Sequence, residues 1–145
     1  MLARTHGQPA TPVTFGKEML VFVSRLKEEI KTLCSIDVLT KLNGATGGFN
    51  AHHCVFPNSD WISFSQSLME EFNKSSISKT SGFMQGLMFR LRYNPVTTQI
   101  EPHDSFARIF DSMKRINMIL IDFCQDIWRY ISDGWIKQRA VKGEI

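Results

Sequence analysis

The chain has little excess charge, few cysteines and no long hydrophobic run, and each of these absences limits what it can be. Its 145 residues carry 17 basic and 14 acidic side chains, a balance that favours neither nucleic acid nor a membrane surface as a partner. No apolar run reaches the roughly 18 residues that a membrane-spanning helix needs. The N-terminus lacks the pattern of a secretory signal, so we expect a cytoplasmic protein.

The cysteines are too few and too widely spaced for a disulfide framework. Cys34, Cys54 and Cys124 are odd in number and have apolar neighbours, which predicts reduced thiols packed as small hydrophobic residues. His52 and His53 next to Cys54 bring to mind a metal site, but adjacent side chains point in different directions and no second pair has ligand spacing. We therefore expect structural histidines, no metal and no cofactor.

Hydrophobic periodicity is what the sequence does have. Apolar residues recur at intervals of three and four along 14–43, which predicts a long amphipathic helix that ends at Asn43-Gly44. A second pattern of this kind begins near Asp104 and continues to Ile131. No alternation typical of strands is present. The sequence thus predicts an all-α, long-helix bundle.

The second long pattern is apolar almost all the way round between Ile116 and Ile131. A helix of about thirty residues extends roughly 45 Å, which is longer than a compact domain of this size needs. A helix that is apolar on every side is buried in something larger than one amphipathic pair. We therefore predict a bundle shared between the subunits of a homo-oligomer.

Shorter segments connect these two patterns. The stretch 43–53 contains three glycines, which permit tight turns and close backbone approach. Residues 57–60 offer a helix cap, and the apolar residues of 61–72 have the spacing of one helix face. Residues 73–82 are polar and poor in helix formers, which predicts an exposed loop. An apolar patch that fits neither template follows at 83–89.

The opening stretch places an imidazole between a hydroxyl group and an amide, as Thr5-His6-Gly7-Gln8. By residue type alone, a histidine that is near a terminus and followed by glycine is most often a surface residue. His103, which follows a proline, is expected at a helix start rather than as a catalytic base. The residue types leave the role of His6 open.

Four segments, taken together and in order, resemble the adenylosuccinate lyase family of the fumarase/aspartase superfamily. The resemblance covers nearly the whole chain except roughly 73–90, and it implies the central helical-bundle domain of such a lyase, over residues 1–145. The four segments are Thr5–Pro12 with Gly16-Lys17-Glu18, "KLNGATGGFNAH" at 41–52, "NPVTTQIEPHD" at 94–104 and "ILIDFCQDIWRYI" at 119–131.

The resemblance implies β-elimination of fumarate from adenylosuccinate, to give AMP, and from the succinyl-carboxamide intermediate of purine biosynthesis. The histidine of the family's Thr-His-Gly-Gln motif is the general acid, which is His6 in this sequence. An imidazole with its unperturbed pKa near ~6.5 can hold and give a proton around neutral pH. Thr5 and Gln8 would bind substrate or orient the ring, and Gln99 matches the glutamine that contacts substrate in the family.

The resemblance also implies parts that these residues do not supply. In the family, each active site is assembled from three subunits of a tetramer, and the base is a serine in a Ser-Ser-x-Met-Pro-x-Lys-x-Asn loop. That loop, the N-terminal domain and the C-terminal domain are expected outside this sequence. We therefore expect a fragment that is inactive alone. The stretch 73–92 is longer than the usual family connection, which predicts an inserted loop.

Two other functions remain as alternatives. One is a non-catalytic helical module that keeps the oligomerising surfaces without the chemistry. The other is a lyase of the same superfamily that acts on argininosuccinate or aspartate, which "TTQIEPHD" and "NGATGGFNAH" disfavour. A full-length sequence containing the serine loop would favour the enzyme over the module.

Overall fold

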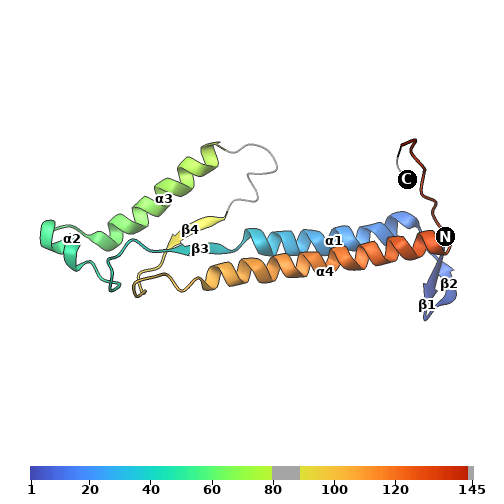
Figure 1. Cartoon of the computed structure of the whole chain (residues 1–145), viewed down its shortest axis with the longest axis horizontal. Coiled ribbons are helices and arrows are strands. Elements are labelled where there is room, and N and C mark those ends of the chain that lie inside the picture. Colours follow the sequence, from blue (N-terminus) through green and yellow to red (C-terminus); the bar gives the residue numbers. More distant parts are fainter. Residues whose placement is uncertain (80–88, 144–145) are drawn as a thin grey trace. The chain divides into compact units, whose positions relative to one another are not determined.

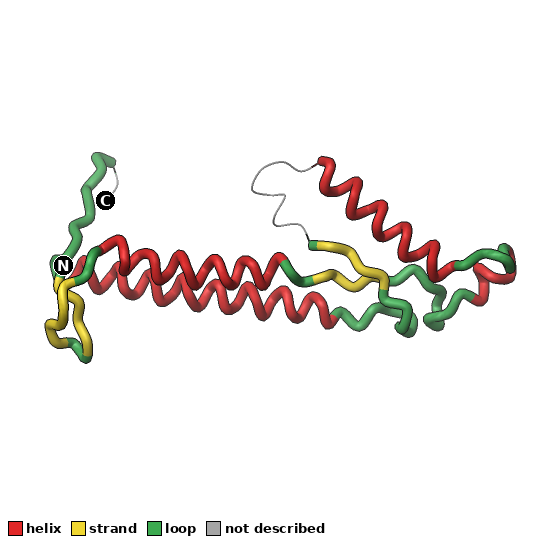
Figure 2. Tube along the Cα trace, turned by 180° about the vertical axis from the view of Figure 1, so that it is seen from behind, coloured by secondary structure: helices red, strands yellow, loops and turns green. Residues whose placement is uncertain are grey.

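The computed structural model describes residues 1–79 and 89–143, and it divides into two compact units. We call Met1–Ile30 with Met113–Ile145 the first unit, and Lys31–Ser112 the second unit. Figures 1 and 2 show the elements of both. In chain order the elements are β1 Leu2–Thr5, β2 Gln8–Pro12, α1 Phe15–Cys34, β3 Asp37–Thr40, α2 Asn50–Val55, α3 Trp61–Lys79, β4 Arg90–Tyr93 and α4 Asp104–Ser132.

Helices dominate the described residues, so the helical part of the fold prediction is confirmed. The all-α class is too narrow, because two small sheets are present. Strands β1 and β2 form an antiparallel hairpin, and β3 pairs with β4 in parallel. Within the described residues, no helix combines the length and the hydropathy that crossing a bilayer requires.

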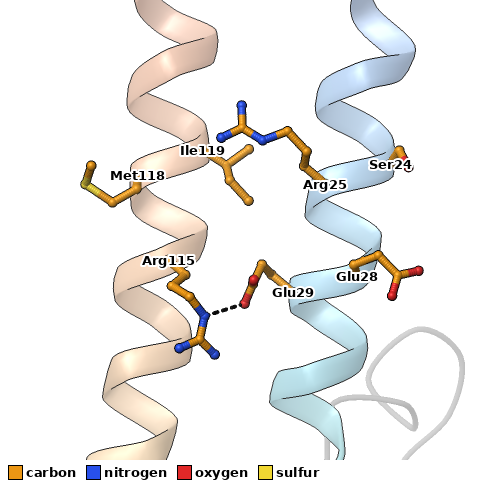
Figure 3. A pocket seen from close by; sticks show the side chains of 7 residues that line it. All are labelled: Ser24, Arg25, Glu28, Glu29, Arg115, Met118 and Ile119. Carbon is orange, nitrogen blue, oxygen red and sulfur yellow. Dashed lines mark hydrogen bonds and ion pairs between the residues drawn. The ribbon is translucent and has the colours of Figure 1, made fainter.

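In the first unit, α1 and α4 pack side by side and antiparallel, as Figures 1 and 2 both show. The rings of Phe22 and Phe123 meet edge to face with their centroids 5.2 Å apart. Further along α1, the Arg115 guanidinium donates to the Glu29 carboxylate at 2.9 Å (Figure 3). Phe22 and Ile119 are buried in this contact layer, at 7% and 6% exposure. Each helix therefore buries one apolar stripe against the other.

The remaining faces of these two helices keep large apolar side chains at the surface. On α4, Met118, Ile121 and Trp128 are 54%, 54% and 65% exposed, and Leu20 of α1 is 60% exposed. This matches the prediction that the apolar residues of α4 extend beyond one face. A single helical pair leaves them uncovered.

Helix α1 ends at Cys34, so its predicted extension to Asn43 is wrong. The Ser35 hydroxyl donates to the Thr32 carbonyl at 2.7 Å, and the Ile36 N–H bonds three residues back to Leu33, which tightens the last turn. The next residues take an extended conformation as β3, where their backbone groups pair with β4. Apolar residues that follow Cys34 belong to β3, and a strand also buries some of its side chains. Their spacing was therefore mistaken for a continuing helix.

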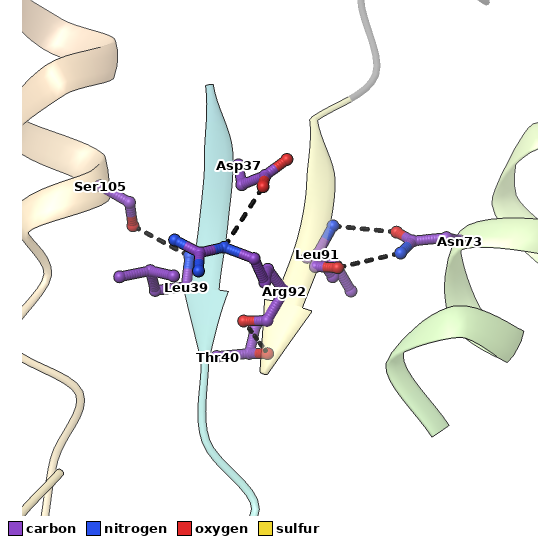
Figure 4. Close-up of polar contacts among 7 residues, drawn as sticks. All are labelled: Asp37, Leu39, Thr40, Asn73, Leu91, Arg92 and Ser105. Atoms are coloured by element: carbon purple, nitrogen blue, oxygen red, sulfur yellow. Dashed lines mark hydrogen bonds and ion pairs between the residues drawn. The ribbon is translucent and has the colours of Figure 1, made fainter. Parts of the chain in front are cut away.

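The second unit is built around the parallel pair β3 and β4, whose outer edges are covered by side chains. On one edge, the Leu39 N–H donates to the Ser105 hydroxyl of α4 at 3.2 Å. On the other, the Asn73 amide of α3 bonds both the N–H and the carbonyl of Leu91, each at 2.9 Å (Figure 4). Asn73 thus takes the place of a neighbouring strand, and both edges of the pair are closed.

Parallel pairing brings two sequence motifs together. Thr40, the last residue of β3, is opposite Tyr93, the last residue of β4, and the Asn94 N–H donates to the Thr40 carbonyl at 2.8 Å. The segments that follow the two strands therefore leave the sheet at the same end, where both strands have their carboxyl termini. They are the glycine-rich motif from Lys41 and the motif that contains Gln99.

Helix α3 begins as predicted but extends further than predicted. The Asp60 carboxylate accepts from the Ser63 N–H at 3.0 Å and from its hydroxyl at 2.7 Å, and these bonds hold the Asp60 pKa below its usual value of 3.8. Residues 73–79 continue the helix and Arg90–Tyr93 form β4. The prediction of a loop over 73–92 is therefore wrong for both of these stretches. Asn73 of this helix bonds Leu91 of β4 through its side-chain amide. Residues 80–88 lie outside the described part, and an insertion stays a prediction.

Removing the Ser105 hydroxyl tests the closure of the β3 edge. Ser105 is fully buried, so a Ser105→Ala variant leaves the Leu39 N–H without its acceptor. We expect a loss of about 1–3 kcal/mol in the free energy of unfolding. Thermal unfolding followed by circular dichroism measures this, with Ser24→Ala at an exposed position of α1 as the control. Equal midpoints for the two variants would contradict this description of the edge.

Candidate functional site

The hairpin of β1 and β2 presents the Thr-His-Gly-Gln motif at its turn. Thr5 is opposite Gln8, and His6 and Gly7 form the two-residue connection between them. Both turn residues have positive φ, 52° for His6 and 74° for Gly7, as tight hairpin turns require. All four residues of the motif are exposed. The structure therefore brings Thr5, His6 and Gln8 together.

Arg4 braces this turn. Its Nη1 donates to the Gly7 carbonyl at 3.1 Å, and its guanidinium lies over the Trp135 ring, 5.9 Å from the centroid. At the open end of the hairpin, Met1 and Val13 bond through their backbones in both directions, at 2.8 and 2.9 Å. The hairpin is thus fixed at both ends, although nothing in the composition of the motif indicated Arg4.

A cavity of about 500 Å³ lies between the hairpin and the nearby ends of α1 and α4. Within it, the Tyr130 hydroxyl donates to the Glu18 carboxylate at 3.4 Å. Burial raises the Tyr130 pKa, and the Asp126 and Glu18 carboxylates raise it further, so the phenol keeps its proton at neutral pH. Thr5 and Gly7 line this cavity from the hairpin, whereas His6 is not among the lining residues.

Gln99 belongs to the second unit, in the segment after β4, and its side chain is exposed. Its backbone is held by the Lys41 ammonium, which donates to the carbonyls of Gln99, Thr98 (3.1 Å) and Gly44 (3.2 Å). The hairpin residues and Gln99 thus occupy different units. The roles assigned to these residues stay predictions.

The glycine-rich turn packs tightly on the segment that carries Gln99. Gly47 has φ +82°, and a Cβ built on it would lie 2.0 Å from the Thr97 carbonyl oxygen. The Asn43 amide donates to the Gly47 carbonyl at 3.0 Å and to the Thr97 hydroxyl at 2.7 Å. Only glycine fits this position, because both its conformation and its neighbour exclude a side chain.

On the other side of Gln99, the chain is anchored by a buried carboxylate. Glu101 is 6% exposed, and its oxygens accept from the His103 N–H at 2.7 Å and from the Asn94 amide at 3.2 Å. The His103 carbonyl in turn accepts from the N–H of Phe106 in the first turn of α4. The prediction that His103 is a helix-start residue is therefore confirmed. Sequence reasoning missed Glu101 and Lys41, whose only signal was their place inside the two motifs.

The segment with two histidines and a cysteine forms helix α2. The His52 ring packs edge-on against Trp61 at 4.9 Å and Phe49 at 5.2 Å, which gives it a packing role. Within the described residues, no group of three or more potential ligand side chains could hold a metal. Cys54 and Cys124 are free but exposed, so their predicted burial as small hydrophobic residues is wrong for this chain by itself.

Comparison with known proteins gives matches along the whole chain. The family model described as lyase matches residues 1–144. The chain is 44% identical to the adenylosuccinate lyase of Vibrio cholerae serotype O1 over 145 residues, and 46% identical to that of Haemophilus influenzae. The adenylosuccinate lyase of Dictyostelium discoideum is 46% identical over 146 residues. Each alignment includes 100% of this chain and 28% of the relative, so the chain spans little more than a quarter of their length.

A side chain at Gly47 tests the packing of the glycine-rich turn. Gly47→Ala forces a non-glycine residue to φ +82° and places its Cβ against the Thr97 carbonyl. We expect a loss of about 2–5 kcal/mol in the free energy of unfolding, from backbone strain and overpacking together. Gly16→Ala is the matched control, because nothing lies within 4 Å of a Cβ there. Equal thermal stability of the two variants would show that the turn is not held against Thr97.

Proposed function

The chain belongs to the lyase family, and from this premise we propose that it is the central, mainly helical domain of an adenylosuccinate lyase. The observation that carries the proposal is the alignment of the entire chain, at 44–46% identity, with relatives of that name. The complete protein would cleave adenylosuccinate to AMP and fumarate, and would release fumarate from the succinyl-carboxamide intermediate of purine biosynthesis. Its place would be the cytoplasm.

In this reaction a base removes a proton from the carbon next to a carboxylate. The electron pair forms the double bond of fumarate while the carbon–nitrogen bond breaks, and the departing nitrogen takes up a proton. We assign the donation of that proton to the His6 imidazole, because histidine is the side chain that most often acts as a general acid. Its exposed place in a tight turn supports this, because nothing within the hairpin covers the ring.

Polar groups that do not compete for protons would hold the substrate. Thr5 and Gln8 face each other at the base of the turn and flank His6, so each can bond the substrate or orient the ring. Gln99 would supply an amide from the second unit. The anchored backbone on both sides of Gln99 supports a binding role for an exposed side chain.

The complete site would need other chains and other segments. The exposed apolar side chains of α1 and α4, among them Leu20, Met118 and Trp128, support a shared helical bundle in a homotetramer. The serine base of the family lies in a loop that these 145 residues do not contain. We therefore propose that this domain contributes the acid and part of the binding surface, and that the base comes from elsewhere in the assembly.

The 145-residue chain alone is expected to release no fumarate from adenylosuccinate, because it does not contain the serine loop that supplies the base in the family. Fumarate released by the purified chain can be measured by a coupled absorbance assay. Turnover clearly above that of buffer would contradict the division of the site between segments.

The role of His6 can be tested in a chimera in which this chain replaces the matching stretch of the Escherichia coli adenylosuccinate lyase, to which it is 44% identical. We expect His6→Gln to lower kcat by about 100-fold or more, as loss of a general acid does. His53→Gln, at an exposed position of α2, should leave kcat unchanged. An assembled chimera that cannot cleave adenylosuccinate, or a His6→Gln variant at full rate, would contradict the proposal.

A further inference from the structure

We propose that Lys41 and Asn43 are positioning residues that set the place of Gln99, without touching the substrate themselves. The inference rests on the proposed function in one respect, the contact between Gln99 and substrate. Its structural part stands on the contacts between the glycine-rich turn and the segment Thr97–Gln99. These two segments are more than fifty residues apart in sequence.

Lys41 ties together the two segments that leave the β3–β4 sheet. Its Nζ donates to the Gly44 carbonyl in its own turn, at 3.2 Å, and across to the carbonyls of Thr98, at 3.1 Å, and Gln99. Hydrogen bonds from a charged donor are stronger than neutral ones. A half-buried ammonium therefore fixes two successive peptide groups of the Gln99 segment.

Asn43 holds Thr97, the residue just before Thr98 and Gln99. Its Nδ2 donates to the Thr97 hydroxyl at 2.7 Å and to the Gly47 carbonyl at 3.0 Å. The turn is itself closed by a bond from the Gly44 N–H to the Gly48 carbonyl at 2.7 Å. Three consecutive residues, Thr97 to Gln99, are thus held from one side by a closed turn.

The number of N–H protons on Lys41 and Asn43 indicates that these side chains position Gln99 and do not bind the substrate directly. An ammonium has three protons, and all three of Lys41 have carbonyl acceptors in its turn and in the Gln99 segment. Both amide protons of Asn43 have acceptors as well. Its Oδ1 has no partner among the described residues, but that atom is buried and has no surface open to a ligand. Neither side chain has a proton left for an anionic ligand, whereas the Gln99 side chain is exposed.

Gln99 therefore combines an anchored backbone with a free amide. A binding group must be kept within about 0.5 Å of its productive place by its surroundings, and side chains on loops need such support most. Lys41 supplies it on both sides of the Gln99 side chain, through the carbonyls of Thr98 and of Gln99 itself. Glu101 supplies it two residues later by accepting from the His103 N–H. The arrangement predicts that loss of Lys41 acts through Gln99.

The test is a double-mutant cycle in the chimera described above, with Lys41→Met, Gln99→Ala and both together. We expect Lys41→Met to lower kcat/KM for adenylosuccinate by about 10- to 100-fold, mainly through KM, because Gln99 binds substrate in the ground state as well. In the Gln99→Ala background the same change should have less than about a twofold effect. Lys41→Arg, which keeps a charged donor, should recover part of the loss.

Lys31→Met is the matched control, at an exposed lysine of α1, and should leave kcat/KM unchanged. An equal effect of Lys41→Met in both backgrounds would overturn the proposal, since a general structural role predicts that result. So would an unchanged KM.

Hydrogen exchange of the peptide 94–103 tests the structural part without any activity. This peptide includes the N–H groups of Val96 and His103, which are hydrogen-bonded in the anchored segment. Lys41→Met should speed its exchange and leave that of α1 unchanged. Unchanged exchange would overturn the proposal. If the chimera is inactive but Lys41→Met speeds exchange of this peptide, the proposed function is contradicted. The anchoring of the segment by Lys41 is then still confirmed.

Discussion

The parallel pairing of β3 with β4 is the constraint on which the second unit depends. It ends α1 at Cys34, because the following backbone groups bond across the sheet instead of along a helix. It also aligns Thr40 with Tyr93, so that the glycine-rich turn and the Gln99 segment emerge side by side. Beyond the strands, the two segments are held together by direct contacts. The Gly47 backbone packs against the Thr97 carbonyl, and the Lys41 ammonium donates to carbonyls of both segments. The place of the candidate binding group Gln99 thus depends on strand register as well as on its neighbours in sequence.

The first unit follows a different principle, in which one helical pair supports a small hairpin. The packed stripe of α1 and α4 includes Phe22 and Ile119, while Leu20 and Trp128 stay at the surface. Exposed apolar surface of this kind marks an interaction site, which is what the proposed shared bundle requires. The hairpin is held within the first unit by the Arg4 bond to Gly7 and by the bonds between Met1 and Val13. The candidate acid, His6, lies at its exposed turn.

The sequence was sufficient for features that depend on local chemistry. A helix cap was expected within 57–60, and Asp60 supplies it, while His103 lies at the start of α4 as expected. It was insufficient wherever distant residues decide. Four-residue strands carry too short a pattern to distinguish from a continuing helix. The bonds of Asn73 to Leu91 join residues 18 apart in sequence, which no local pattern indicates. Arg4, Lys41 and Glu101 sat inside recognised motifs, but their partners could be identified only in three dimensions.

We propose that the His6 imidazole gives its proton to the departing nitrogen and that Gln99 binds the substrate. A structure of the assembled chimera with bound adenylosuccinate is the decisive measurement. We expect a His6 ring nitrogen within about 2.6–3.2 Å of the bridging nitrogen of the substrate, and the Gln99 amide in contact with the ligand. A substrate bound with His6 far from that nitrogen, and another side chain in its place, would show that His6 is not the acid.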